Sequence, residues 1–122
     1  MKSCLVVDDS KVVREFARRI MEGLSFQVNE AGNGREAIDA CKKAMPDVIL
    51  LDWNMPVMDG LACLTELRTI PHNDKAVVIF CTAENDIPHI QKAIGAGANE
   101  YIMKPFNTEI LRDKLNQTGL LP

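Results

Sequence analysis

Long hydrophobic runs are missing from the 122-residue sequence, and their absence excludes two classes of protein. No segment approaches the roughly 18 consecutive apolar residues that a membrane-spanning helix needs. The N-terminal stretch MKSCLVVDDS reaches acidic residues after four apolar ones, which is too short for the core of a signal peptide. We therefore expect a cytoplasmic protein that does not insert into membranes.

A strong excess of one charge and closely spaced cysteines are also missing. The net charge of -3 gives no general attraction to nucleic acid or anionic lipid, so no nucleic-acid partner is expected. The histidines have no partner at a zinc-like spacing, and we interpret both His72 and His89 as solvated. The cysteines form no C-x-x-C pair and lie in apolar segments, which indicates buried, reduced thiols at Cys4, Cys41, Cys63 and Cys81.

Short apolar runs alternate with amphipathic stretches along the whole chain, without an internal linker or repeat. This pattern predicts one domain over residues 1–122, built from five strand–helix units. Three of the predicted strands are continuous aliphatic runs, as expected for central strands that helices cover on both faces. The predicted strands are Cys4–Asp8, Phe26–Ala31, Val48–Asp52, Ala76–Thr82 and Glu100–Lys104, of which the first, third and fourth are central.

Apolar residues recur at helical spacing between these strands. Gly23 ends the first predicted helix, and Gly95 and Gly97 end the fourth. The first helix also carries several arginines on one face. We interpret this basic face as solvated surface or as part of a kinase-docking face. The five apolar stripes are Val12, Val13, Phe16, Ala17, Ile20 and Met21; then Ala37, Ile38 and Cys41; Leu61, Leu64 and Leu67; Ile87, Ile90 and Ile94; and Ile110, Leu111 and Leu115. The pattern predicts an α/β protein with a doubly wound parallel sheet, which binds ligands at the carboxyl ends of its strands.

The predicted central strands end in polar or charged residues, as VILLDWNMPVMDG illustrates. Asp8 and Asp9 end the first, Asp52 the third and Thr82 the fourth, while Lys104 ends the fifth strand. Each has an ordinary alternative role as a helix cap, turn residue or loop lysine. Three carboxylates at one rim repel one another, however, unless a hard cation such as Mg²⁺ lies among them. With a hydroxyl and an ammonium beside them, the set predicts phosphoryl transfer.

The motifs VVDDS, LLDWNMPVMDG, CTAE and YIMKPF resemble the signature of response-regulator receiver domains, in that family's order and over the whole chain. The resemblance implies a flavodoxin-like (βα)5 fold with strand order 2-1-3-4-5 and a single receiver domain without an output domain. It implies that Asp52 accepts a phosphoryl group from a histidine kinase or phosphotransfer protein. Asp9, Asp52 and the backbone carbonyl of Asn54 would hold Mg²⁺, and Asp8 would act largely through a coordinated water.

The resemblance also assigns roles to residues around the phosphoacceptor. Lys104 would pair with the phosphoryl oxygens and precede a cis peptide bond to Pro105. Thr82 would donate its hydroxyl to the phosphoryl group, and Tyr101 would be the aromatic residue of a conformational switch. Gly60 would allow a tight loop next to the site. Two further side chains would tune the lifetime of the phosphorylated state, Asn54 and Glu84.

The output of such a module is less constrained by the sequence. DWNMP, TAEN and AGANEYIMKPF look closest to CheY-like chemotaxis regulators, bacterial proteins that bind the flagellar motor switch. We expect a monomer that turns over no external substrate and binds an effector through its fourth helix, fifth strand and fifth helix. A phosphorelay shuttle or phosphate sink is the alternative. An aspartate-nucleophile phosphatase is less favoured because DDS replaces D-x-D, and a flavin carrier because no Ser/Thr/Gly-rich loop follows the first strand.

Overall fold

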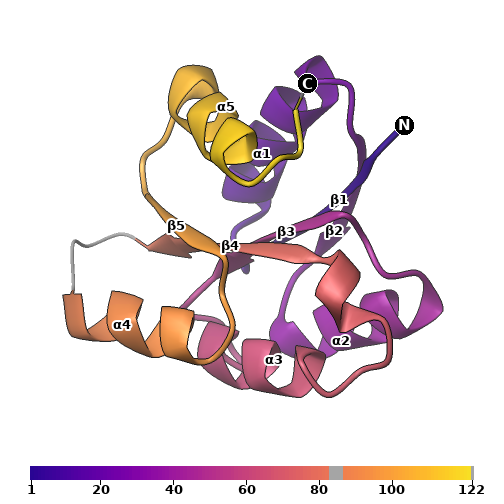
Figure 1. The fold of residues 1–122 in the computed structure, drawn as a ribbon, viewed down its shortest axis with the longest axis vertical. Helices are drawn as coiled ribbons and strands as arrows, with labels where there is room; N and C mark the ends of the chain where they lie inside the picture. Colours follow the sequence, from indigo (N-terminus) through magenta and orange to yellow (C-terminus); the bar gives the residue numbers. More distant parts are fainter. Residues whose placement is uncertain (83–86, 122) are drawn as a thin grey trace.

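A five-stranded parallel sheet in the order β2-β1-β3-β4-β5 forms the centre of the molecule (Figure 1). The computed structural model describes residues 1–82 and 87–121, so the predicted site residue Glu84 lies outside the described residues. The elements are β1 (Ser3–Val7), α1 (Lys11–Gly23), β2 (Gln27–Ala31), α2 (Gly34–Lys43), β3 (Val48–Asp52), α3 (Gly60–Leu67), the 3-10 helix η1 (Asn73–Lys75), β4 (Val77–Thr82), α4 (Ile87–Gly95), β5 (Glu100–Met103) and α5 (Thr108–Gln117). The predicted fold class and strand order are confirmed.

The helices cover the sheet on both faces, with α1 and α5 on one side and α2, α3 and α4 on the other (Figure 1). Side chains of a strand point alternately to the two faces, so each central strand supplies both cores. In β1, Leu5 and Val7 pack toward α2 and α3, whereas Cys4 and Val6 pack toward α1 and α5. This double burial explains why the central strands are aliphatic at every position. No helix in residues 1–82 and 87–121 is long and apolar enough to cross a membrane.

Two predicted strands were one residue too long at their carboxyl ends. β1 ends at Val7 and β5 at Met103, so Asp8 and Lys104 are the first residues beyond them. One further backbone hydrogen bond continues each ladder, from Asp8 N to the carbonyl of Ala31 (3.1 Å) and from Lys104 N to the carbonyl of Thr82 (2.7 Å). The backbone therefore carries both charged side chains out of the sheet at a fixed position.

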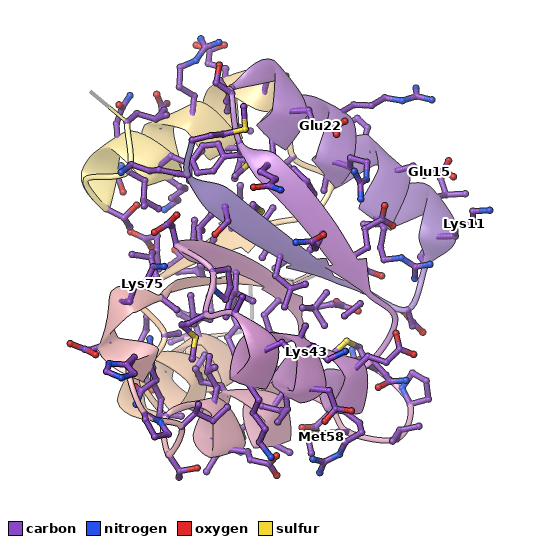
Figure 2. The ribbon with its side chains drawn as sticks, turned by 90° about the vertical axis from the view of Figure 1, so that its right-hand side faces the viewer. Lys11, Glu15, Glu22, Lys43, Met58 and Lys75 are labelled. Atoms are coloured by element: carbon purple, nitrogen blue, oxygen red, sulfur yellow. The ribbon has the colours of Figure 1, made fainter. Side chains whose placement is uncertain are left out.

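The apolar stripe predicted for α1 was partly wrong. Ser10 caps the helix and Ala17 is buried, but Val12 is 76% exposed and Phe16 is 47% exposed. The first turns of α1 lie beside the loop after β5, where the rings of Phe16 and Phe106 are 5.9 Å apart. Lys11, Glu15 and Glu22 project from the outer side of the helix (Figure 2). The amino-terminal half of the stripe therefore lines a surface groove instead of the core.

The stripes predicted for α4 and α5 were also partly wrong. Ile87 is 60% exposed and Ile94 45%, while the buried residue of α4 is the small Ala93. In α5, Leu111 is buried as predicted but Ile110 is 42% exposed. Both helices lie next to β5, which is an edge strand, so the sheet covers only part of each apolar stripe.

All four cysteines are buried and free, as predicted. Burial raises the pKa of Cys41 to about 11 and that of Cys63 to about 12. Burial likewise raises the pKa of Cys4 and of Cys81. These thiols are therefore protonated and unreactive at neutral pH.

Candidate active site

The predicted site residues meet at the carboxyl edge of the sheet. Asp8 follows β1, Asp52 ends β3, Thr82 ends β4 and Lys104 follows β5. Because β1, β3, β4 and β5 are parallel neighbours, these four positions come from adjacent strand ends. The topology therefore brings together side chains that are far apart in the sequence.

Three carboxylates form a compact cluster at this edge. Asp8, Asp9 and Asp52 each offer an oxygen, and these atoms lie within 4.8 Å of one another. Asp8 is buried, Asp52 is half-buried and Asp9 is exposed, so the cluster opens to solvent on one side. An all-oxygen set of this kind, open to water ligands, suits Mg²⁺, which prefers one or two carboxylates together with waters.

Asp8 has a partner for every polar atom. Lys104 Nζ donates to Oδ2 at 2.6 Å, and the backbone N–H of Ser10 donates to Oδ1 at 2.9 Å. Arg14 Nη1 donates to the carbonyl oxygen at 2.8 Å, and the N–H bonds to Ala31. The side chain is only 5% exposed, so these bonds replace the water that a carboxylate would otherwise need.

Lys104 joins two of the three carboxylates. Its Nζ atom lies 2.9 Å from Asp52 Oδ1 as well as 2.6 Å from Asp8 Oδ2. Burial lowers the pKa of Lys104, but the hydrogen bonds to Asp8 and Asp52 outweigh it, so the pKa is raised overall. The following peptide bond, to Pro105, is cis, as the resemblance implies. Because the pKa of Lys104 is raised, a charged ammonium faces Asp52 at neutral pH.

The carboxyl group of Asp52 is destabilised in its ionised form. Burial raises its pKa, the hydrogen bond and charge of Lys104 oppose that rise, and the charges of Asp8 and Asp9 add to it. One ammonium thus pairs with two of the three carboxylates, Asp8 and Asp52. A divalent cation in the cluster would favour ionised Asp52, which is the form that acts as a nucleophile.

The loop after β3 turns back tightly over Asp52. Gly60 N donates to the carbonyl of Trp53 at 2.8 Å, and Asp59 caps α3 by accepting from Ala62 N at 2.8 Å. A Cβ atom on Gly60 would collide with the backbone carbonyl of Asp52 and would lie 2.8 Å from Cε1 of Phe80. The prediction of a tight loop at Gly60 is confirmed. Asn54 is exposed within this loop.

Thr82 and Tyr101 line the same small cavity between the sheet and α4, together with Phe80 and Ala93. Its volume is about 10 Å³, room for no more than one water. Tyr101 is half-buried, and Lys114 Nζ lies 5.0 Å from the centre of its ring. A shift of Thr82 or α4 would therefore change the space available to this ring.

His89 is exposed on α4, as interpreted from the sequence, but it also contacts an aromatic side chain. Its ring lies 4.6 Å from that of Trp53, which in turn lies 5.1 Å from the ring of Phe80. His72 is exposed, as predicted. The interpretation of the arginines on α1 as solvated or kinase-docking surface missed their intramolecular ion pairs, because Arg14 and Arg18 both pair with Glu30 of β2. These contacts join residues far apart in the chain, so no sequence pattern predicts them.

Comparison with known proteins assigns this arrangement to a family. The sequence profile described as response regulator receiver domain matches residues 4–116. The chain belongs to this receiver family. Chemotaxis protein CheY of Thermotoga maritima is 35% identical over 119 residues, which cover 97% of this chain and 98% of that relative. Protein CcdB of Bacillus subtilis is 39% identical over 113 residues, which cover 91% of this chain and 92% of that relative.

Solved receiver structures match the fold closely. Chemotaxis protein CheY4 of Vibrio cholerae superposes with a TM-score of 0.91 at 32% identity, over 96% of this chain and 98% of that one. The receiver domain of a sensor histidine kinase from Pseudomonas aeruginosa gives a TM-score of 0.87 at 26% identity, over 95% of each chain. That receiver domain has a magnesium ion coordinated in its active site cleft. Two-component signalling is therefore the functional context of this chain.

Proposed function

We propose that this receiver accepts a phosphoryl group on Asp52 from a phosphohistidine and changes its binding to a protein partner in response. One observation carries the proposal: Asp52 lies in a three-carboxylate cluster, and its Oδ1 atom is 2.9 Å from the ammonium of Lys104. A nucleophilic carboxylate beside a fixed cation is the arrangement that phosphoryl transfer requires.

The residues of the site divide the chemistry between them. Mg²⁺, held by Asp9, Asp52 and the carbonyl of Asn54, would supply neutralising charge for the phosphoryl oxygens. A carboxylate oxygen of Asp52 attacks phosphorus, the bond from phosphorus to the donor imidazole breaks, and that imidazole retains the electron pair. Lys104 exchanges Asp52 for a phosphoryl oxygen, and Thr82 donates its hydroxyl to another. The chain thus catalyses its own phosphorylation and turns over no external substrate.

Labelling with acetyl phosphate tests this assignment. The wild-type protein should incorporate one phosphoryl group, only when Mg²⁺ is present, and Asp52→Asn should incorporate none. Asp59→Asn is the matched control, because Asp59 is an exposed carboxylate of the same loop that caps α3 outside the cluster. Full labelling of Asp52→Asn would overturn the proposal, and so would loss of labelling in a folded Asp59→Asn variant only.

We further propose that the phosphohistidine donor sits on the groove formed by α1 and the loop after β5. Val12, Phe16, Pro105 and Phe106 line this groove of about 510 Å³, and Lys104 is among its lining residues. Because the groove is mostly apolar and includes Lys104, which bonds to Asp52, a donor helix bound there would bring its histidine toward Asp52. Phe16→Ala should therefore slow transfer from a phosphohistidine protein while leaving labelling by acetyl phosphate unchanged.

The proposed output is chemotaxis, through an effector that docks on α4, β5 and α5. The relatives named CheY support this output, and each of the three elements exposes an apolar side chain: Ile94, Met103 and Ile110. A phosphorelay shuttle or phosphate sink would use the same site. The relative at 39% identity is named CcdB and not CheY, so similarity at this level does not by itself select chemotaxis. A purified flagellar switch protein should bind more tightly when beryllofluoride occupies the site. Unchanged binding would favour the shuttle or sink.

We propose that the protein acts as a cytoplasmic monomer.

A further inference from the structure

The loop between β1 and α1 carries two of the three carboxylates, so its conformation decides the shape of the cluster. Residues 8–10 form this loop, and Asp9 within it is exposed. Backbone and side-chain bonds around Asp8 and Ser10 hold both ends of the loop. The orientation of the Asp8–Asp9 peptide unit between them depends on what binds the carbonyl oxygen of Asp8.

Arg14 binds that carbonyl from one turn into α1. Its Nη1 atom donates to the oxygen of Asp8 at 2.8 Å, while its Nε atom donates to Oε1 of Glu30 at 3.0 Å. The Arg14 side chain is 19% exposed and that of Glu30 25%, so the pair lies at the surface with part of each side chain covered. Glu30 belongs to β2, so the rigid sheet fixes the direction of the guanidinium.

We propose that Arg14 is a positioning residue for the metal site: by binding the carbonyl of Asp8, Arg14 fixes the direction of Asp9. This proposal rests on the proposed function. The peptide unit is planar, so holding the oxygen of Asp8 also sets the direction of the bond to the Cα atom of Asp9. Outer-shell contacts of this kind orient metal ligands, and their loss weakens metal binding by roughly 10- to 100-fold. Since Arg14 acts through backbone, we expect the lower end of that range.

Charge alone predicts the opposite effect. Arg14 carries a positive charge close to the carboxylate cluster, so removing it without structural consequence would strengthen the binding of a cation. Positioning predicts that removing it weakens the binding. The sign of the change therefore separates the two roles.

Arg18 supplies a matched control within the same network. It lies one turn further along α1, and its Nε atom donates to Oε2 of the same Glu30 at 2.6 Å. Its second ion-pair partner is Glu22, at 3.2 Å, and neither partner belongs to the site. Arg18→Gln thus removes the same charge and one Glu30 pair without releasing the Asp8 carbonyl.

The unphosphorylated proteins are titrated with MgCl₂. Isothermal calorimetry and the fluorescence emission of Trp53, the sole tryptophan, both monitor the binding. The dissociation constant should rise about tenfold in Arg14→Gln, and it should stay equal or fall in Arg18→Gln. Arg14→Lys, which keeps the charge and one donor, should recover at least half of the loss on a logarithmic scale.

Equal affinities of Arg14→Gln and Arg18→Gln would overturn the positioning role, and so would tighter binding by Arg14→Gln. If Arg14→Gln does not fold, the comparison of Arg14→Met with Arg18→Met decides in the same way, because only the first removes the donor to the carbonyl of Asp8. A wild-type protein that shows no Mg²⁺ binding would contradict the proposed function instead, so the two failures are distinguishable.

Discussion

The imidazole of His89 lies against the indole of Trp53, with ring centroids 4.6 Å apart and ring planes inclined at 38°. His89 belongs to α4, and Trp53 directly follows Asp52 at the end of β3. The contact therefore links the residue next to the proposed phosphoacceptor with the helix of the proposed effector face. A movement of α4 must change the surroundings of the sole tryptophan.

Replacing His89 by alanine tests this contact. His89→Ala should lower the free energy of unfolding by about 0.5 to 1.5 kcal/mol, the range for an aromatic pair, and make Trp53 more accessible to acrylamide. His72→Asn is the control, because His72 is exposed in a loop with φ of 66°, a conformation that asparagine tolerates. Identical quenching in both variants would show that the ring contact does not persist in solution.

Replacing Lys104 by methionine should expose the repulsion within the carboxylate cluster. The side chains of Lys104, Asp8 and Asp52 are 20%, 5% and 12% exposed, so their charges are poorly screened. Without Mg²⁺, Lys104→Met should lose about 3 kcal/mol of stability in urea unfolding, because a buried carboxylate loses its partner.

Added Mg²⁺ should restore part of that loss, since a cation in the cluster replaces the missing charge. Arg35→Met is the comparison, because the Arg35–Glu66 pair is 46% and 36% exposed and should contribute less than about 1 kcal/mol. Equal losses in the two variants, with no effect of Mg²⁺, would contradict the electrostatic account of the site.

Alanine at Gly60 should be strongly destabilising, whereas alanine at Gly95 should not. An added Cβ at Gly60 meets the carbonyl of Asp52 and the ring of Phe80. The carbonyl belongs to the backbone of β3, so moving it away would disturb the strand and cost stability. At Gly95 an added Cβ meets nothing within 4 Å, and Gly95 is not among the glycines with a positive φ, so alanine should fit there without strain. We expect Gly60→Ala to lose more than about 2 kcal/mol in thermal unfolding. A neutral Gly60→Ala variant would mean that the loop after β3 is not tight.

Sequence patterns predicted the fold and most of the site because both follow from rules about strands. Aliphatic runs identified the central strands, and parallel strand ends must share one edge, which placed Asp8, Asp52 and Lys104 together. Periodicity failed at Phe16 and Ile87, because it shows which residues share a helix face and not whether anything covers that face. Contacts set by tertiary geometry alone, such as Arg14 to the carbonyl of Asp8, have no signature along the chain.

Removing the charge of Asp52 should stabilise the protein at neutral pH without Mg²⁺. Burial raises the pKa of Asp52 above its ordinary value of 3.8, so the folded state binds the proton more tightly than the unfolded state. Stability of the wild type therefore falls as the pH rises from 3.8 through the raised pKa. Asp52→Asn lacks this loss, so its urea midpoint should exceed that of the wild type at pH 7, and the two should converge below pH 3.8. A constant difference at all pH values would rule out titration of Asp52 as the cause.

The phosphorylated state of this protein should be short-lived. Asn54 lies two residues beyond Asp52 and is exposed in the loop that covers the site. The receiver resemblance places this side chain beside the path of the water that attacks the phosphoryl group. A small amide leaves that path open, so an in-line water needs little rearrangement, and we expect decay within seconds to minutes at neutral pH in Mg²⁺. Glu84, the second residue assigned to this role, lies outside the described residues.

Asn54→Arg should slow the decay by blocking the water path, on the order of tenfold, which corresponds to about 1.4 kcal/mol in the barrier. Asn29→Arg adds the same charge at an exposed position in the middle of the edge strand β2, outside the loop after β3, and should leave the decay unchanged. Loss of label from the purified phosphoproteins measures both rates. A wild-type half-life of hours would contradict the open path and weaken the proposal of chemotaxis, because a motor signal must be erased quickly. Equal slowing by both arginine variants would instead assign the effect to charge and not to obstruction of the attacking water.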